Sequence, residues 1–315
     1  MCDKIIVILG PTSSGKTGLA VRLAHKFNGE IISADSRQVY RGMDIGTGKD
    51  LGEYAIKKRG GKIKIPYHLI DVADPKKYFD LARYQKLAQK AIEDILKRGK
   101  LPIIAGGTGL YLQALVDGYC LPPAKPDRKL RMALENKTAE ELFIMLKKLN
   151  PKFAAKINQS DRKNKRRLTR YVEVAKMPKI SERNGQSPEA LPEKKYDFLI
   201  LGIKTPKEIL DQRIEKRLFD RLEKEGMVAE VERLREEGIS WKRLLNFGLE
   251  YKHIALYLQE KLEYDEMTEK LLMAIKKYAR KQMTWYRRWE RQGKKINWVG
   301  DYEDARKLAG KFLSQ

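Results

Sequence analysis

Short apolar runs alternate with stretches of helical spacing over the first part of the chain. The runs of strand length lie at residues 4–9, 30–34, 67–72, 101–105 and 198–203. Apolar positions recur at helical spacing over residues 16–28 and 81–95. Strands that alternate with helices are typical of a parallel sheet. We therefore predict an α/β fold in which helices flank a parallel sheet.

Two glycines mark expected helix ends. Gly29 follows the first helical stretch and Gly99 follows the second. Helices commonly end at a glycine in the left-handed conformation. We expect Gly29 to be such a cap and Gly99 to close its helix.

The pattern changes at about residue 122 and changes back near residue 195. Three prolines interrupt the chain at the start of this part: Pro122, Pro123 and Pro126. Charge-rich helical segments follow, and a link rich in Ser, Pro, Glu and Lys (residues 181–195) ends it. We interpret residues 122–195 as a helical insertion into a core formed by residues 1–121 and 196–315.

The core ends in a mainly helical part. Pro206 suits the first position of a helix. The longest helix is predicted over residues 265–292, and its inner stripe comprises Leu271, Leu272, Ile275, Tyr278, Ala279, Met283 and Tyr286.

The first apolar run leads without a gap into an octapeptide with the pattern G-x-x-x-x-G-K-[ST]. Its residues are Gly10, Pro11, Thr12, Ser13, Ser14, Gly15, Lys16 and Thr17. In such a P-loop, backbone N–H groups at the positive end of a helix bind phosphate oxygens. Lys16 adds a positive charge, and the Thr17 hydroxyl suits Mg²⁺. We therefore predict a P-loop NTPase-like sheet that binds a di- or triphosphate with Mg²⁺.

Positive charge greatly exceeds negative charge. The chain has 66 Lys and Arg against 42 Asp and Glu, a formal net charge of +24. One diphosphate needs only a few cations, so the excess favours a larger polyanion, with nucleic acid as the leading candidate. The alternative is a lysine-rich surface without a specific partner.

Cysteines and histidines indicate no structural metal or disulfide. Cys2 and Cys120 are the only cysteines, and neither lies in a C-x-x-C pattern, which suits a reducing cytosol. His25, His68 and His253 lack metal-ligand spacing. The first strand begins almost at the start of the chain, and no apolar run reaches about 18 residues. We expect a cytoplasmic protein without a signal peptide or membrane span.

Ligands bind at the carboxyl ends of strands in open α/β sheets. Asp35 follows the run at residues 30–34, where it could accept a proton from a nucleophile that attacks beside the phosphates. It could equally cap a turn or hold Mg²⁺ through water. Gly106 and Gly107 stand where many P-loop hydrolases have an acid, which argues against a motor-type ATPase. Thr108 could donate to a phosphate oxygen or cap the following helix.

Basic residues cluster at three further places. Six of the ten residues at 161–170 are basic, which suits either phosphate-backbone contacts or a solvated helix face. Arg213 and Arg217 could reach the leaving phosphates or pair with Glu215 or Asp220. The C-terminal helix carries Trp285, Tyr286 and Trp289, which suit the core better than base stacking. The basic residues around them favour a basic face: Lys276, Lys277, Arg280, Lys281, Arg287 and Arg288.

Six segments together resemble the bacterial tRNA dimethylallyltransferases. They lie at residues 10–17, 33–40, 44–47, 68–71, 106–111 and 281–285. The Ser-Ala-Asp-Ser-x-Gln-Val-Tyr pattern is far more specific than the P-loop, and the match extends from residue 5 to about residue 292. Residues 247–252 depart from the family pattern, which leaves their role open.

The resemblance implies transfer of a dimethylallyl group from dimethylallyl diphosphate to N6 of the adenine just 3′ of a tRNA anticodon. The P-loop, with Arg213 and Arg217, would hold the diphosphate. Asp35 would be the general base, and Lys16 and Thr108 would act at the reacting centre. The insertion would bind the anticodon stem-loop of a monomeric enzyme. The tRNA-binding residues implied are Asp35, Ser36, Arg37, Gln38, Thr108, Arg131, Arg166, Arg167, Arg170, Arg280 and Gln282.

Two other functions fit parts of this pattern. A P-loop kinase of small molecules would also place an acid such as Asp35 beside the γ-phosphate. A nucleic-acid-binding NTPase or a structural RNA-binding protein would also be basic. The large charge and the basic insertion argue against the kinase, and the missing acid at Gly106 and Gly107 argues against the NTPase.

Overall fold

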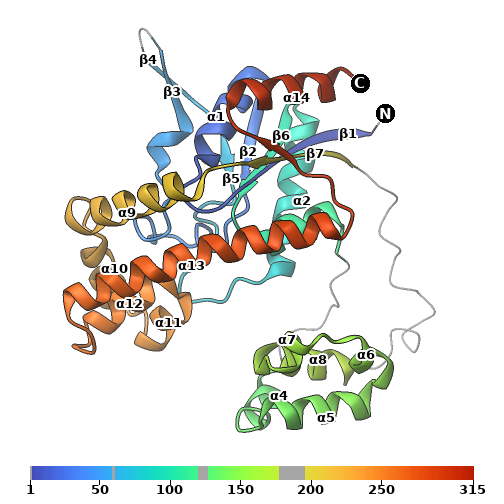
Figure 1. Cartoon of the computed structure of the whole chain (residues 1–315), viewed down its shortest axis with the longest axis vertical. Coiled ribbons are helices and arrows are strands. Elements are labelled where there is room, and N and C mark those ends of the chain that lie inside the picture. Colours follow the sequence, from blue (N-terminus) through green and yellow to red (C-terminus); the bar gives the residue numbers. More distant parts are fainter. Residues whose placement is uncertain (1, 59–60, 120–126, 177–195) are drawn as a thin grey trace. The chain divides into compact units, whose positions relative to one another are not determined.

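Six parallel strands form the central sheet of the computed structural model (Figure 1), which describes residues 2–58, 61–119, 127–176 and 196–315. The strand order is β5–β2–β6–β1–β7–β8. The bounds are Asp3–Leu9 for β1, Gly29–Ser33 for β2, Tyr67–His68 for β5, Leu101–Gly106 for β6, Tyr196–Ile203 for β7 and Asn297–Val299 for β8. In register, Ile6 of β1 lies opposite Ile103 and Leu199. The predicted P-loop NTPase-like α/β fold is confirmed.

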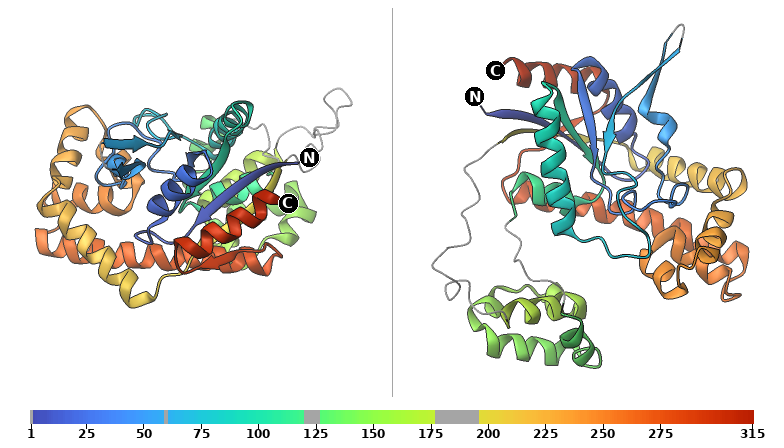
Figure 2. Two further views of the ribbon diagram at one scale, coloured as in Figure 1. Left: turned by 90° about the horizontal axis from the view of Figure 1, so that it is seen from above. Right: turned by 180° about the vertical axis from the view of Figure 1, so that it is seen from behind.

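Helices cover both faces of this sheet, which explains why its strands read as continuous apolar runs. Alternate strand residues such as Ile5 and Val7 face one core with α2, α3 and α13, and Ile6 and Ile8 face another with α1 and α14. Seen from above, α2 and α14 lie on opposite sides of β1 (Figure 2). The bounds are Lys16–Lys26 for α1, Leu81–Lys97 for α2, Gly109–Val116 for α3, Tyr264–Arg291 for α13 and Tyr302–Ser314 for α14.

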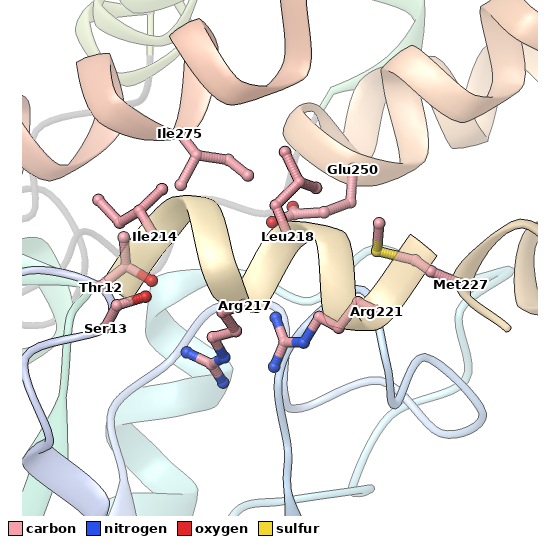
Figure 3. Close-up of a pocket in the computed structure, with 9 residues that line it drawn as sticks. All are labelled: Thr12, Ser13, Ile214, Arg217, Leu218, Arg221, Met227, Glu250 and Ile275. Atoms are coloured by element: carbon pink, nitrogen blue, oxygen red, sulfur yellow. The ribbon is translucent and has the colours of Figure 1, made fainter. Parts of the chain in front are cut away.

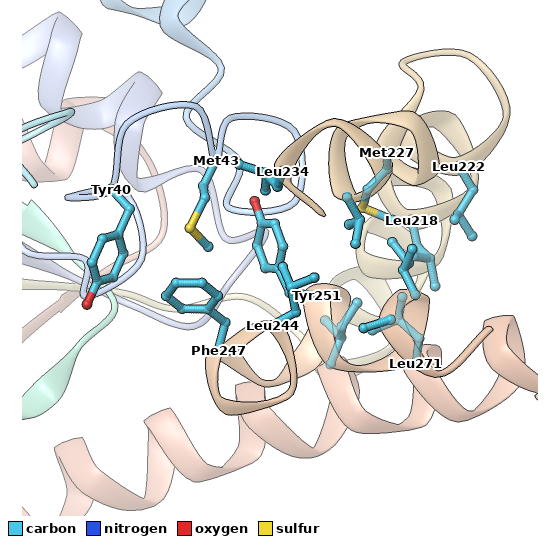
Figure 4. Close-up of a cluster of buried hydrophobic side chains, with 14 of the residues drawn as sticks. Tyr40, Met43, Leu218, Leu222, Met227, Leu234, Leu244, Phe247, Tyr251 and Leu271 are labelled. Carbon is cyan, nitrogen blue, oxygen red and sulfur yellow. The ribbon is translucent and has the colours of Figure 1, made fainter. Parts of the chain in front are cut away.

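A third core joins the segment after β2 to a helical lobe (Figure 4). In it, Tyr40 packs edge-on against Phe247, which in turn contacts Tyr251. The lobe comprises α9 (Lys207–Glu223), α10 (Met227–Glu236), α11 (Trp241–Phe247) and α12 (Leu249–Tyr257), together with part of α13. The segment that carries Asp35 and Gln38 leads directly into this core through Val39, Tyr40 and Met43. It contains no helix or strand of its own before the short helix η1 (Leu51–Tyr54).

The chain divides into two compact units. Residues Met1–Tyr119 and Lys194–Gln315 form one, and Cys120–Glu193 form the other. The described helices of the second unit enclose a separate core that includes Leu142, Leu146 and Leu168. They are α4 (Arg128–Ala133), α5 (Ala139–Leu149), α6 (Pro151–Lys156), α7 (Gln159–Arg162) and α8 (Lys165–Ala175). The three predicted proline breaks and the link at 181–195 lie outside the described residues.

Two local predictions differ from the structure. The strand predicted at 67–72 stops at His68, because Leu69 and Asp71 take left-handed backbone angles with φ of 65° and 58°. Asn28, with φ of 49°, is the left-handed residue after α1, whereas Gly29 already belongs to β2. A Cβ on Gly29 would lie 2.8 Å from the carbonyl oxygen of Leu101, so close strand approach is the reason for this glycine.

Short strands were also missed. The hairpin of β3 (Ala55–Lys58) and β4 (Gly61–Lys64) and the edge strand β8 are too short for apolar periodicity to reveal them. Gly99, with φ of 65°, closes α2 as predicted. Within the described ranges, none of the helices combines the length and the apolar character that crossing a bilayer requires.

The buried carboxylate of Glu30 connects neighbouring elements near the edge of the sheet. Glu30 of β2 is almost fully buried and accepts hydrogen bonds from Arg98 and from His68 Nε2 at 2.7 Å, and Lys100 lies 2.9 Å away. The hydrogen bonds from Arg98 are the main cause that lowers the pKa of Glu30 to about 2. A carboxyl group whose pKa is lowered by folding stabilises the fold above its unfolded pKa, and this contribution disappears as the pH falls toward the folded pKa.

We predict that Glu30→Gln flattens the acid limb of the stability curve. Between about pH 4.5 and about pH 2, protonation of Glu30 should remove up to about 1.4 kcal/mol of unfolding free energy per pH unit, and the Gln variant should lack this component. Urea unfolding at several pH values measures it, with the exposed Glu266→Gln as control. Parallel acid limbs for wild type and Glu30→Gln would contradict the assignment.

Candidate active site

Three loops meet at the carboxyl ends of β1, β2 and β6. Together they line a pocket of about 570 Å³, called here the P-loop pocket. Its lining includes Lys16 and Thr17 from the first loop, Asp35 and Gln38 from the second, and Gly107 from the third. The predicted convergence of these loops is therefore observed in the structure.

The first of these loops is shaped to bind an anion. Ser13 and Gly15 take left-handed backbone angles, with φ of 60° and 86°. Gly15 precedes α1 and provides no side-chain cap, so the first N–H groups of the helix remain available. Successive N–H groups in such a turn form a concave anion site at the positive end of the helix dipole.

Helix α13 fastens this loop to the third one. The Gln282 amide accepts a hydrogen bond from the Thr12 N–H at 2.8 Å and donates one to the Gly107 carbonyl, also at 2.8 Å. The Tyr286 hydroxyl lies 3.2 Å from the carbonyl oxygens of both Gly10 and Gly107. Both side chains are buried, so these bonds form away from water.

Glycine is needed where these loops approach one another. A Cβ on Gly106 would lie 2.3 Å from the Ala34 carbonyl oxygen, and one on Gly107 would lie 2.3 Å from Gln282 Nε2. The two glycines that replace the acid of P-loop hydrolases therefore permit this close contact between β2, β6 and α13.

Asp35 and Thr108 lie side by side at the junction of β2 and β6. One carboxylate oxygen of Asp35 accepts the Arg37 N–H at 2.8 Å, so Asp35 does cap a turn. Within the described residues its other oxygen accepts no hydrogen bond, and Asp35 lines the pocket. The Thr108 hydroxyl does not cap α3 and instead accepts the Ser36 N–H at 3.0 Å.

Tyr278 of α13 completes this corner, and the sequence indicated it only as a core residue. It lines the P-loop pocket and hydrogen bonds to the Thr108 side chain. Burial raises the pKa of Tyr278 well above its usual value, so its hydroxyl is protonated and can donate. The Thr108 hydroxyl oxygen accepts the Ser36 N–H, so its own proton can point to the Tyr278 oxygen or toward a ligand.

The amide of Gln38 has a defined orientation. Its Oε1 accepts from the Ser33 hydroxyl at 3.0 Å, and its Nε2 donates to the Gly48 carbonyl at 2.9 Å. Each of these atoms retains one further hydrogen-bonding position toward the pocket.

Buried charges hold the segment that follows Gln38. Lys49 is 1% exposed, donates to the Tyr40 carbonyl at 2.7 Å and pairs with both Asp44 and Asp71. Glu230 of α10 accepts three consecutive backbone N–H groups, those of Asp44, Ile45 and Gly46, at 2.7–3.1 Å. It also accepts the Tyr251 hydroxyl at 2.7 Å.

Two arginines of α9, Arg217 and Arg221, lie near the P-loop. Arg217 lines the P-loop pocket, and both Arg217 and Arg221 pair with Asp50. The expected alternative partners of Arg217 are wrong, because Asp220 pairs with Lys216 and Lys224, and Glu215 pairs with Lys276. Arg213 is exposed and lines neither pocket, whereas Arg221, one turn beyond Arg217, lines the second pocket described next.

A second pocket, called here the α9 pocket, adjoins the same face of the P-loop (Figure 3). Its wall includes four apolar side chains, and Arg217 and Arg221 extend from α9 in the same direction. Glu250, from the stretch that departs from the family pattern, also lines it. The lining comprises Thr12, Ser13, Ile214, Arg217, Leu218, Arg221, Met227, Glu250 and Ile275.

The other predicted RNA contacts divide between the two units. In the first unit, Ser36 and Arg37 lie beside the pocket-lining Asp35, and Arg280 is exposed on α13. In the second unit, Arg131 and Arg170 pair with the buried Glu173, and Arg167 pairs with Asp161. Arg166 is exposed without a partner among the described residues. Their contacts with RNA stay predictions.

Electrostatics at Lys16 favour a bound anion. Its Nζ donates to the Pro11 carbonyl at 2.7 Å. Burial lowers the pKa of Lys16 to about 8 and Arg217 acts in the same direction, whereas Asp35 and Glu53 oppose the shift. A diphosphate would stabilise the charged amine, so it should bind more tightly while Lys16 is protonated.

We predict that Gln282→Leu loosens the site. It removes the partner of the Thr12 N–H and leaves the Gly107 carbonyl with the Tyr286 hydroxyl alone. A buried polar group without a partner costs about 1–3 kcal/mol. Urea unfolding should show this loss, and calorimetry should show weaker binding of Mg²⁺-diphosphate. Thr284→Ala, two residues along the same helix and exposed, serves as control. Unchanged stability and affinity in Gln282→Leu would show that these two hydrogen bonds do not hold the loops together.

We also predict that diphosphate affinity falls as the pH rises through about 8, because Lys16 then loses its proton. The limiting fall is about tenfold per pH unit. Calorimetry from about pH 7 to about pH 9.5 measures it, and Lys16→Arg should show a weaker dependence since guanidinium stays charged. Titration of the diphosphate itself is common to both proteins and cancels. Identical pH profiles would contradict the role of Lys16.

Comparisons with known proteins agree with this geometry. The profile of the IPP transferase family matches residues 38–289, and that of the Isopentenyl transferase family matches residues 3–59. tRNA dimethylallyltransferase 1 from Syntrophus aciditrophicus is 45% identical over 307 residues, which is 96% of each chain. tRNA dimethylallyltransferase 2 from Treponema denticola is 45% identical over 93% of this chain and 95% of its own.

Solved structures show the same likeness. The tRNA isopentenylpyrophosphate transferase from Bacillus halodurans is 32% identical, with a TM-score of 0.66 over 99% of this chain and 96% of its own. A eukaryotic dimethylallyltransferase acting on tRNA is 31% identical, with a TM-score of 0.72 over 90% of this chain and 69% of its own. The chain therefore belongs to the IPP transferase family.

Proposed function

We propose that this protein transfers a dimethylallyl group from dimethylallyl diphosphate to N6 of the adenine just 3′ of a tRNA anticodon. The observation that carries this proposal is the P-loop pocket, in which an anion-binding loop and a carboxylate with one unoccupied oxygen line the same space. A second support is the naming of similar proteins as dimethylallyltransferases that act on tRNA.

Asp35 is suited to act as the general base. An adenine amine is a weak nucleophile because its lone pair is delocalised into the ring, so removal of a proton during attack helps. The Arg37 N–H holds one oxygen of Asp35 and leaves the other for that proton. A positioned base typically contributes about 10²–10⁴-fold to the rate.

The leaving diphosphate gains negative charge as the carbon–oxygen bond breaks. The P-loop N–H groups, Lys16 and Arg217 are placed to stabilise that charge. The Thr108 hydroxyl can donate to the same group while its oxygen accepts the Ser36 N–H, and Tyr278 lies beside it.

The residues present fit a Mg²⁺ ion that is bound mainly by substrate phosphates. The Thr17 hydroxyl lines the pocket and hydrogen bonds to the Glu53 carboxylate. No cluster of three or more His, Cys, Asp or Glu in the described ranges could hold a metal without the substrate, which is the usual situation for Mg²⁺ at phosphates. When bound, the ion would neutralise charge on the leaving diphosphate.

The α9 pocket is suited to the dimethylallyl chain. Ile214, Leu218, Met227 and Ile275 give it an apolar wall, and it shares Thr12, Ser13 and Arg217 with the P-loop pocket. A branched five-carbon chain could therefore leave water while its diphosphate stays at the P-loop.

The adenine must leave its stack to reach Asp35, as in other enzymes that modify bases. Gln38 could then recognise it, because a glutamine amide can bond to N6 and N7 of adenine together. Both amide atoms of Gln38 are already oriented by Ser33 and Gly48. The basic insertion, with Arg166 exposed, would contact the stem-loop backbone.

A direct assay tests the proposal. The protein is incubated with dimethylallyl diphosphate, Mg²⁺ and an anticodon stem-loop with adenines after the anticodon, and the RNA is digested for mass spectrometry. We expect N6-dimethylallyladenosine at the first adenine 3′ of the anticodon. Absence of any prenylated nucleoside, with both ligands shown to bind, would refute the proposal.

We predict that Asp35→Ala lowers kcat by about 10²-fold or more while the Kd for tRNA changes little. The physical reason is the loss of the carboxylate that we propose accepts the amine proton. Single-turnover kinetics and fluorescence anisotropy measure the two quantities. Asp301→Ala, which removes a helix cap at α14, is the control. Turnover equal to wild type would exclude Asp35 as the base.

A further inference from the structure

The hairpin of β3 and β4 projects from the first unit (Figure 1). Its strands pair antiparallel, with Ile56 opposite Ile63, Lys57 opposite Lys62, and Ala55 opposite Lys64. β3 follows directly after Tyr54, which lines the P-loop pocket. The hairpin therefore begins at the edge of the candidate active site.

The two faces of this hairpin differ. Side chains alternate between the faces of a strand, so Ile56 and Ile63 share one face. Ile56 packs against the core formed by β1 and α1, whereas Ile63, farther along the hairpin, is exposed. The register places Lys57, Lys62 and Lys64 on the opposite face, and all three are exposed. These three residues are called here the lysine face.

The lysine face carries uncompensated charge. In the described part of the chain no acidic side chain pairs with any of its three residues, whereas Lys49, Lys100 and Lys294 each have a carboxylate partner. Lys57 and Lys62 are directly opposite in the ladder, and like charges at such positions are destabilising. A phosphate between them would relieve this repulsion.

We infer that the lysine face binds the phosphate backbone of RNA whose target base occupies the P-loop pocket. The identity of the RNA as substrate rests on the proposed function. Lys57 is three residues beyond Tyr54 in sequence, and strands rise about 3.3 Å per residue, so the first contact lies about 10 Å from the pocket edge. That distance is short enough for nucleotides that flank the flipped base.

The test removes the three charges and follows RNA binding. The ribbon variant carries Lys57→Gln, Lys62→Gln and Lys64→Gln, and the control variant carries Lys86→Gln, Lys90→Gln and Lys97→Gln on the exposed side of α2. Both lose the same charge. Anisotropy of a fluorescently labelled unmodified tRNA is measured over a series of salt concentrations, and thermal melts confirm folding.

Each lysine–phosphate contact contributes about 0.7–0.9 to the slope of log K against log salt. We expect the ribbon variant to lower that slope by about 2 and the control variant to leave it nearly unchanged. Transfer at saturating RNA should keep its wild-type kcat, because the lysine face touches no reacting atom. Equal slopes for the two variants would overturn the inference, as would a ribbon variant that only self-associates, since edge lysines can serve merely to block strand pairing.

The two proposals fail separately in this design. If the wild-type protein transfers no dimethylallyl group but the ribbon variant still loses salt-dependent RNA binding, the proposed function is wrong and the lysine face stands. If transfer occurs and the ribbon variant binds RNA as the control does, only the lysine face is wrong.

Discussion

The hydrogen bonds of one amide, that of Gln282, join the parts on which the rest of the site depends. This side chain connects the Thr12 N–H of the P-loop to the Gly107 carbonyl of the loop after β6, and Tyr286 reinforces the same junction one turn later. Because α13 also packs into the core beneath α2 and α3, sheet, phosphate loop and catalytic corner share one rigid support. Gly107 makes that junction possible, since a Cβ there would collide with the Gln282 amide, and Gly106 permits the close approach of β6 to the Ala34 backbone.

Most acidic side chains near the pocket are paired with basic side chains or backbone N–H groups. Asp50 neutralises Arg221 and part of Arg217, Asp44 and Asp71 neutralise Lys49, and Glu230 is saturated by backbone N–H groups. These contacts anchor the segment after β2 without adding a free base to it. Asp35 is left as the pocket-lining carboxylate with an open oxygen. Lys16 lines the same pocket, so the carboxylate proposed for proton removal and the cation proposed for the leaving diphosphate border one space.

The fold and the main site were predictable where local patterns are strong. Continuous apolar runs revealed the long parallel strands, and the P-loop motif together with the Ser-Ala-Asp-Ser pattern located Asp35 and Lys16. Contacts made over long sequence distances were not predictable. Glu230 reaches back more than 180 residues to the amides of Asp44 and Gly46, and no periodicity in α10 shows it. Tyr278 was indistinguishable from its apolar neighbours because its hydroxyl matters only beside Thr108. Arg221 alone carried a usable signal, since it continues the one-turn spacing of Arg213 and Arg217.

We propose that the P-loop serves to release diphosphate from carbon rather than to transfer a phosphoryl group. Phosphorus NMR of a reaction with dimethylallyl diphosphate, ATP and anticodon stem-loop RNA together tests it most directly. We expect inorganic diphosphate to accumulate in step with modified adenosine while the ATP signals stay constant. Conversion of ATP to ADP, with dimethylallyl diphosphate left intact, would contradict it.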